Sequence, residues 1–388
     1  MNRHAPAPRA AGPFEHIGLF YRDLDQYASG CAAFVRRALA SGDPALVAVP
    51  GGNGELVRAR LGADGDAVTF ADMARAGRNP GRIIPSVLLA FAGAHPGRRV
   101  WIIGEPIWKG RSAVEYPACV AHEALINAAF AGRDAAILCP YDASALAPSA
   151  LADAERTHPI LEDADGSRAS AAYGDPLETA AAFDWPLPAP PEDAERYTFT
   201  GVGALPGVRD FLTVRAMAEG LAGERVVELL LAMNELATNT TEYTTGPATL
   251  TVWAEDGVLA CQLDDTGHIA DPMTGRVPPA DGATRGRGVL IANELADLVR
   301  IHHRPAGTSV RLHFLLSPPG DPAAAGAGGG LAETAVAEAG GSLAWTAAAG
   351  AGGNLAQTAA GGAGGDLVQT AAVEDSGNDP VSAGFSGS

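Results

Sequence analysis

The chain has 388 residues, of which 47% are hydrophobic, and its formal net charge is −18. At roughly 150 residues per domain, this length allows two or three domains, and the acidic balance argues against a nucleic-acid-binding surface, which would be basic. No apolar run approaches the roughly 20 residues of a membrane helix, and the first residues lack the apolar segment of a signal peptide. The cysteines show no CxxC spacing and suggest neither a zinc site nor a disulfide framework: Cys31, Cys119, Cys139 and Cys261. We therefore expect a cytoplasmic protein without a nucleic-acid or membrane partner.

The first part of the chain alternates short apolar runs with segments of helical periodicity. A Pro/Ala-rich arm at residues 1–13 precedes them and is expected to be disordered. Predicted strands lie at 16–21, 45–50, 67–70, within 98–108 and at 135–140, and predicted helices lie at 24–40, within 51–61 and at 86–94 and 116–131. This alternation predicts an α/β domain with a parallel sheet.

A glycine turn, PGGNGE at residues 50–55, stands where a nucleotide-binding P-loop would stand, after a strand and before a helix. Glu55 and Leu56 follow Gly54, in place of the lysine and the serine or threonine that a P-loop uses for phosphate and Mg2+. We therefore expect a RecA-like sheet with a degenerate P-loop that binds no nucleotide.

Several segments of this region together resemble the MEDS sensory domain over residues 14–160: FEHIGLFYRD, ALVAVPGGN, VWIIGEPIW, CPYD and HPIL. The resemblance implies a sensor of small molecules such as hydrocarbon derivatives. Ligands of open α/β sheets bind at strand ends, where we expect five candidate ligand contacts: His16, Tyr21, Glu105, Cys139 and Tyr141. The alternative for His16 and Cys139 is that both are core residues satisfied by backbone. A metal site of Cys139, His16 and His158 is not favoured.

Residues 161–196 are rich in alanine, proline and acidic side chains, which is typical of a linker, here with a short helix at 176–183. The histidine nearest to it is His158. A histidine kinase needs its phosphorylated histidine on a helix, and Pro159 directly after His158 disfavours a helix there. Two-component chemistry is therefore disfavoured.

After the linker, helices and strands no longer alternate as they do in the first part of the chain. Helices are predicted at 208–222, 225–242 and 288–296, a hairpin at 248–254 and 258–263 with its turn at 255–257, and two further strands at 298–303 and 309–315. The segment 271–284 is polar and rich in proline and glycine, as a lid over a nucleotide would be. This order predicts an α+β domain.

Three motifs of this region occur in a diagnostic order: NELATN at 234–239, LDDTG at 263–267 and GATRGRG at 282–288. Together they resemble the N, G1 and G2 boxes of the GHKL (HATPase) ATPases, and most closely those of the anti-sigma-factor serine kinases, over about residues 209–314. The resemblance implies an α/β sandwich over residues 197–316 that binds ATP with Mg2+. It also implies roles for individual residues: Asn239 for Mg2+, Asp265 and Gly267 for adenine, Gly286, Arg287 and Gly288 for the phosphates, and Thr308 beneath the adenine.

Glu235 is the candidate catalytic residue. It lies four residues before Asn239 and should project from the same helix face, where the resemblance implies that it accepts the proton of a substrate serine. The alternative is a Glu235 that only solvates its helix. Tyr243 departs from the family, which often has histidine there.

The implied function is regulation of transcription by phosphorylating a STAS-domain antagonist of an anti-sigma factor, by sequestering a sigma factor, or by both. The N-terminal domain would bind a small-molecule ligand that controls this activity. The alternative is a non-catalytic, ATP-gated protein-binding module, and whether the chain forms a homodimer is left open.

Residues 317–388 are rich in glycine and alanine and contain a repeat in which Leu331, Leu343, Leu355 and Leu367 recur every 12 residues. Such a chain buries too little apolar surface to offset its loss of conformational entropy, so disorder is expected. The alternative is that the repeats associate weakly or that a partner orders them.

Overall fold

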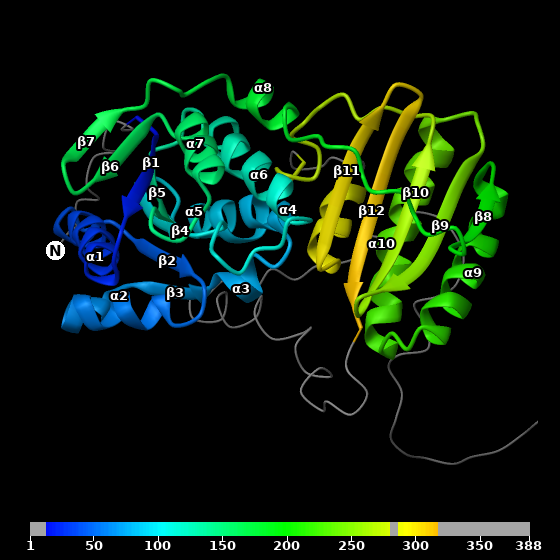
Figure 1. The fold of residues 1–388 in the computed structure, drawn as a ribbon, viewed down its shortest axis with the longest axis horizontal. Coiled ribbons are helices and arrows are strands. Elements are labelled where there is room, and N and C mark those ends of the chain that lie inside the picture. Colours follow the sequence, from blue (N-terminus) through cyan, green and yellow to red (C-terminus); the bar gives the residue numbers. More distant parts are fainter. Residues whose placement is uncertain (1–12, 280–285, 317–388) are drawn as a thin grey trace, which may run out of the picture. The chain divides into compact units, whose positions relative to one another are not determined.

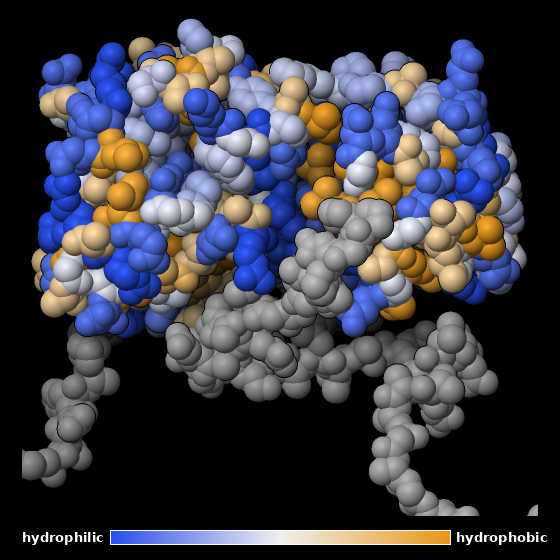
Figure 2. All heavy atoms as spheres, turned by 60° about the horizontal axis from the view of Figure 1, so that its bottom comes forward, coloured by the Kyte–Doolittle hydropathy of each residue, from blue (hydrophilic) through white to orange (hydrophobic). Residues whose placement is uncertain are grey.

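The computed structural model describes residues 13–279 and 286–316, which contain two separate β-sheets (Figure 1). Residues 1–12 of the predicted N-terminal arm, residues 280–284 of the predicted lid and the repeat-containing tail lie outside the described residues. In the part that is described, no helix has the length and apolar character needed to cross a membrane. The face of the molecule drawn in Figure 2 mixes hydrophilic and hydrophobic residues.

The first sheet has seven strands in the order β3-β2-β4-β5-β1-β6-β7. Neighbouring strands run parallel except β6 and β7, which form an antiparallel pair at one edge. The predicted parallel α/β sheet is thereby confirmed, while its RecA-like character and the degenerate P-loop stay predictions. The strands are β1 (Glu15–Tyr21), β2 (Ala45–Val49), β3 (Thr69–Asp72), β4 (Val100–Gly104), β5 (Ala135–Asp142), β6 (Ile160–Asp163) and β7 (Gly166–Ala169).

Helices cover both faces of this sheet (Figure 1). Every residue of β2 and β4 is buried, as expected for parallel strands packed on both sides. The helical segments are α1 (Leu24–Ala40), α2 (Asn53–Leu61), a 3-10 turn (Gly62–Ala67), α3 (Met73–Ala76), α4 (Pro80–Arg82), a π-helical segment (Ile83–Leu89), α5 (Ala90–Ala94), α6 (Tyr116–Ala129), α7 (Pro148–Thr157) and α8 (Pro176–Ala181).

The two faces of the sheet belong to two distinct hydrophobic cores. On β1, Ile17, Leu19 and Tyr21 pack into the core under α1, together with Tyr27 of that helix. On β5, Cys139 and Tyr141 belong to the opposite core, which α6 covers. Successive side chains of a strand point to opposite faces, so this alternation decides which polar residues can meet.

Three segments differ from the sequence prediction. Residues 161–169 are not linker, because Leu161 is buried and β6 pairs with β1 before β7 folds back on it. The helix expected at 86–94 begins at Pro80 and is π-helical around Pro85, whose ring nitrogen has no hydrogen to donate. Helix α7 was not predicted; it has proline in its first turn, and its three buried residues, Ala150, Ala154 and Thr157, include no large apolar side chain.

The second sheet has five antiparallel strands in the order β11-β12-β10-β9-β8. Its helices pack on one face and share a core with Leu250, Cys261 and Leu312 of the sheet. The elements are β8 (Glu195–Phe199), a 3-10 turn (Val202–Ala204), α9 (Leu205–Ala218), α10 (Gly223–Tyr243), β9 (Ala248–Glu255), β10 (Val258–Asp265), α11 (Gly288–Leu295), β11 (Leu298–Arg304) and β12 (Gly307–Leu315). The predicted helices and four strands are confirmed, and β8 is an additional edge strand.

The hairpin between β9 and β10 turns at Asp256 and Gly257, whose φ angles are 51° and 75°. Two consecutive residues with positive φ form the tight turn whose twist matches that of the flanking strands. Strand β10 begins directly after this turn, and the second sequence motif lies at the other end of the strand, from Leu263.

Candidate functional site

Helix α10 carries the first motif. Leu229, Met233 and Leu236 form its buried stripe, while Glu235 and Asn239 lie one turn apart and are half-buried. Among residues 13–279 and 286–316, the side chains of Glu235 and Asn239 make no hydrogen bond or ion pair with one another or with any other residue. Both side chains are therefore available to a ligand.

The second motif ends β10 with the carboxylate of Asp265. The Thr240 hydroxyl donates a hydrogen bond to Asp265 Oδ2 at 2.6 Å, and the Gly267 backbone N–H donates one to Oδ1 at 2.9 Å. An ionised carboxylate has about four acceptor positions, so Asp265 can accept a further hydrogen bond. Thr240 and Gly267 thus fix the orientation of the carboxylate without saturating it.

Residues of β11 and β12 hold this turn in place. The buried Thr308 hydroxyl donates to the Gly267 carbonyl at 2.7 Å, and the Arg304 guanidinium donates to the Asp265 carbonyl at 3.0 Å. Thr308 was placed beneath the adenine by the sequence prediction. In the structure its hydroxyl is engaged by Gly267, so its visible contribution is to hold the turn.

Gly307 lies so close to this turn that no side chain fits. Its φ is 144°, and a Cβ there would lie 1.8 Å from the Asp265 carbonyl oxygen. We expect Gly307→Ala to lower the free energy of unfolding by about 3 kcal/mol, because neither backbone can move aside without breaking the β10–β12 pairing. Urea denaturation measures this change.

Gly93→Ala is the matched control, since Gly93 is helical and a Cβ there meets nothing within 4 Å. It should leave stability unchanged or slightly higher. Equal midpoints for Gly307→Ala and the unmodified chain would contradict the close approach of Gly307 to the Asp265 turn.

The third motif opens α11 directly against α10. A Cβ on Gly288 would lie 2.5 Å from Asn239 Nδ2 and 3.5 Å from Glu235 Cβ, so glycine lets the two helices approach. The first hydrogen bond of α11 is donated by the Ile291 N–H to the Arg287 carbonyl, which leaves the earlier N–H groups of the helix without intrahelical partners. Such N–H groups bind anions. Gly286 and Arg287 precede them at the exposed entrance to the helix.

The surroundings of Glu235 raise the pKa of its carboxyl group. Burial, followed by the nearby Glu242 carboxylate, raises the pKa of Glu235. A carboxylate with a raised pKa accepts a proton more readily than an exposed one. The structure therefore brings together residues from all three motifs, with a Glu235 whose pKa is raised.

Thr240 and Arg304 are site residues that the sequence analysis missed. Thr240 is buried and follows Leu236 by four residues, so it is a polar residue on an otherwise apolar stripe. That interruption is a signal that could have identified it. Arg304 ends an edge strand and carries no comparable signal.

The five predicted sensor residues separate into two groups on opposite faces of the first sheet. Tyr21 and Glu105 lie on the α1 side, where Glu105 accepts hydrogen bonds from the Tyr27 hydroxyl at 2.9 Å and from Asn53 Nδ2 at 3.1 and 3.2 Å. The Tyr21 ring packs edge-on against Tyr27. Asn53 belongs to the glycine turn that follows β2, so this turn contacts an acidic side chain.

Glu105 is only 2% exposed, and burial raises its pKa to about 7 even though Asn53 and Tyr27 act in the opposite direction. Between pH 4.5 and 7 the native state holds a proton that the unfolded state has released, so stability falls as pH rises through this window. We expect Glu105→Gln to remove this dependence on pH. Between pH 4.5 and 8 the free energy of unfolding of the variant should therefore rise by about 3 kcal/mol relative to that of wild type.

Hydrogen exchange of the β4 amides at pH 4.5 and at pH 8 measures this difference in stability between variant and wild type near Glu105. Glu55→Gln, at an exposed position of α2, is the control and should follow wild type. Parallel pH profiles for Glu105→Gln and wild type would contradict a buried Glu105 that titrates near neutrality.

The other three predicted sensor residues, His16, Cys139 and Tyr141, lie on the α6 side. His16 is opposite Ile137 and Cys139 is opposite Gly18, so His16 lies near the start of its strand and Cys139 within its strand, and neither lies at the carboxyl end. Neither is satisfied by backbone alone, because His16 contacts Asn127 and Cys139. A single pocket that contains all five predicted residues is therefore not formed.

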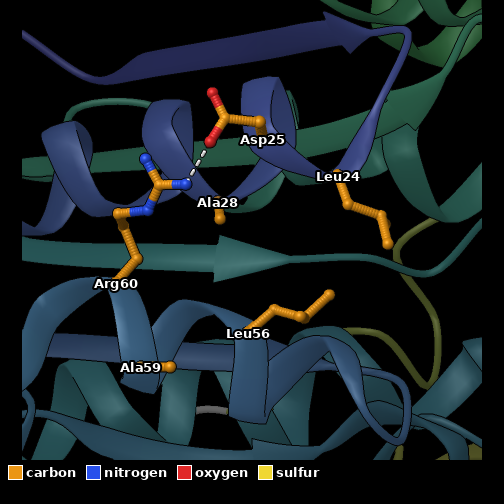
Figure 3. A pocket seen from close by; sticks show the side chains of 6 residues that line it. All are labelled: Leu24, Asp25, Ala28, Leu56, Ala59 and Arg60. Carbon is orange, nitrogen blue, oxygen red and sulfur yellow. Dashed lines mark hydrogen bonds and ion pairs between the residues drawn. The ribbon is translucent and has the colours of Figure 1, made fainter.

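A hollow lies on the surface between α1 and α2 (Figure 3). It is lined by Leu24, Asp25, Ala28, Leu56, Ala59 and Arg60, and Arg60 forms an ion pair with Asp25 across it. None of the five predicted sensor residues lines it.

Two models of known protein families match this chain, one in the region of the first sheet and one in the region of the second. Residues 15–159 match the model of the MEDS domain, described as the methanogen/methylotroph, DcmR sensory domain. Residues 202–314 match the model of the histidine kinase-like ATPase domain. A search of curated proteins found none similar to this chain. The chain thus has an N-terminal MEDS sensory domain and a C-terminal histidine kinase-like ATPase domain.

Proposed function

We propose that the chain is an anti-sigma-type protein serine/threonine kinase controlled by a small-molecule ligand of its MEDS domain. The coarser statement follows from the two domains: a sensory domain joined to a histidine kinase-like ATPase domain indicates a regulatory, ATP-binding, kinase-like protein. The finer proposal adds the reaction and the partner, a STAS-domain anti-sigma-factor antagonist, a sigma factor or both.

The donor set around Asp265 fits ATP with Mg2+. Asp265 is held by Thr240 and Gly267 with acceptor capacity to spare, which suits the adenine amino group. Asn239 has a side-chain oxygen without a partner among the described residues, which suits Mg2+, an ion that uses few protein ligands beside phosphate and water. The first N–H groups of α11 suit the phosphates. Bound Mg-ATP would supply the transferable phosphoryl group.

The observation that carries the kinase proposal is the position of Glu235. It lies one helical turn from Asn239, against Gly288 at the start of α11, and its pKa is raised. A serine or threonine hydroxyl that approaches here would pass its proton to the Glu235 carboxylate.

Two other functions have less support from the structure. A histidine kinase would need an accessible phospho-accepting histidine, whereas His158 is fully buried and caps the end of α7. A non-catalytic binding module would use ATP only to change conformation, and the half-buried Glu235 beside Asn239 would then have no role.

The test uses the full chain with labelled ATP, Mg2+ and candidate STAS-domain proteins. We expect saturable Mg-dependent ATP binding and transfer of the label to a serine or threonine of one partner. ATP binding without transfer to any partner would favour the binding module, and absence of ATP binding would refute both proposals.

A further inference from the structure

Four chemically suitable metal ligands meet inside the MEDS domain. His16 of β1, Glu123 of α6, Cys139 of β5 and His158 after α7 are each at most 1% exposed. One ligand atom from each lies within 4.8 Å of every other. The ATP site uses none of these four residues.

The hydrogen bonds around the two histidines determine where their protons lie. His158 Nδ1 lies 2.8 Å from the Ala154 carbonyl oxygen, which can only accept, so Nδ1 carries the hydrogen. Asn127 Nδ2 donates to the Thr157 carbonyl at 2.9 Å, so its Oδ1 faces His16 Nδ1 at 3.2 Å and accepts from it. Both Nδ1 atoms are therefore donors, and both Nε2 lone pairs point at the cluster.

With these tautomers, the Nε2 atoms of both histidines are hydrogen-bond acceptors, and they face a carboxylate oxygen that is also an acceptor. Glu123 Oε2 lies 3.2 Å from His16 Nε2 and 3.2 Å from His158 Nε2. Among the described residues, both Glu123 oxygens and His158 Nε2 have no satisfying hydrogen bond despite full burial. Buried polar atoms without partners are costly, and a cation would satisfy all of them.

Three of the six separations among the four ligand atoms match those of a tetrahedral metal site, and all six are at most 4.8 Å. With Zn–N and Zn–O near 2.0–2.1 Å and Zn–S near 2.3 Å, the ligand atoms should be about 3.3 Å apart, or about 3.6 Å where sulfur is involved. The observed separations are 3.2 Å for both Nε2–Oε2 pairs and 3.5 Å between Cys139 Sγ and His16 Nε2. Gly18 also makes room, since a Cβ there would be 3.3 Å from the His158 ring.

We propose that His16, Glu123, Cys139 and His158 form a closed transition-metal site that selects Zn2+. The thiolate and the carboxylate neutralise the dication, which suits a fully buried site, and the four protein ligands leave no open position. Asn127 and the Ala154 carbonyl orient the histidines, as outer partners of metal ligands do. The thiol must lose its proton to the solvent when the ion binds. The metal would tie β1 and β5 to α6 and to the end of α7.

Metal analysis of the full chain, purified without a polyhistidine tag, tests the site. We expect one Zn2+ per chain and a lower melting temperature after a chelator removes it, restored when Zn2+ is added back. Cys139→Ala should lose this stoichiometric ion, and Asn127→Ala should weaken Zn2+ binding by about 10–100-fold. Cys119→Ala removes another buried thiol of the same core and should keep the ion.

Cobalt binding provides a second measurement that does not need a variant. Co2+ in the chelator-treated wild type should show a thiolate-to-cobalt charge-transfer band and tetrahedral ligand-field bands. The competing arrangement is a metal-free ion pair in which His158 carries two protons and faces Glu123. A folded wild type that binds neither ion and ignores the chelator would overturn the site. So would a Cys139→Ala chain with undiminished Zn2+ affinity.

Discussion

Glu235→Gln is expected to reduce phosphoryl transfer to the partner serine or threonine by roughly 10²–10⁴, the usual contribution of a general base. Glutamine keeps the shape of the side chain but removes the negative charge that accepts the proton. ATP affinity should stay close to that of wild type, because Asp265, Asn239 and the start of α11 are unchanged. The measurement is single-turnover transfer, with ATP affinity determined in parallel.

Two controls make this result specific. Glu224→Gln alters an exposed acid in the first turn of the same helix and should transfer at the wild-type rate. Glu242→Gln removes the carboxylate that helps to raise the pKa of Glu235, so the acidic limb of the pH–rate profile should move to lower pH. Unchanged transfer in Glu235→Gln would reduce Glu235 to a solvating residue.

Asp265→Asn is expected to weaken ATP binding by about 10–100-fold, the equivalent of losing one hydrogen bond to a charged group. The amide replaces one carboxylate oxygen with a donor. This NH2 group must then face the Thr240 hydroxyl or the Gly267 N–H, which donate to the carboxylate in the unmodified site, or the adenine amino group, which would donate to it under the proposed function. Calorimetric titration of the full chain with Mg-ATP measures the loss.

Asp264→Asn is the matched control for charge at the strand end, since Asp264 precedes Asp265 on the same strand but its side chain contacts Gln262, Ser309 and, at 3.6 Å, Arg304. Its affinity for ATP should equal that of wild type. Equal losses in the two variants would show that the charge of the strand end matters rather than a specific contact with Asp265. Thr240→Val, which frees one oxygen of Asp265, should weaken binding less than Asp265→Asn does.

The sequence by itself determined the order and type of most elements and the identity of the three nucleotide motifs. Helix α10 was predictable because Leu229, Met233 and Leu236 repeat with the helical period, and the hairpin was predictable from two apolar runs around Asp256 and Gly257. Both signals are local. Strand β6 and helix α7 were missed, because β6 forms through pairing with β1 and α7 packs on the core with small side chains.

Tertiary structure alone decided which polar side chains meet. The five predicted sensor residues shared one strand-end pattern, yet the register of β1 and β5 sends Tyr21 and Cys139 to opposite faces. Glu123 carried no signal, because a single acid on a helix has no meaning until the helix is laid on a strand. The zinc ligands proposed above have no CxxC-like spacing for the same reason: they come from four elements far apart in sequence. Side-chain direction has a local period, but contact between distant elements depends on strand register and helix packing, which no local pattern specifies.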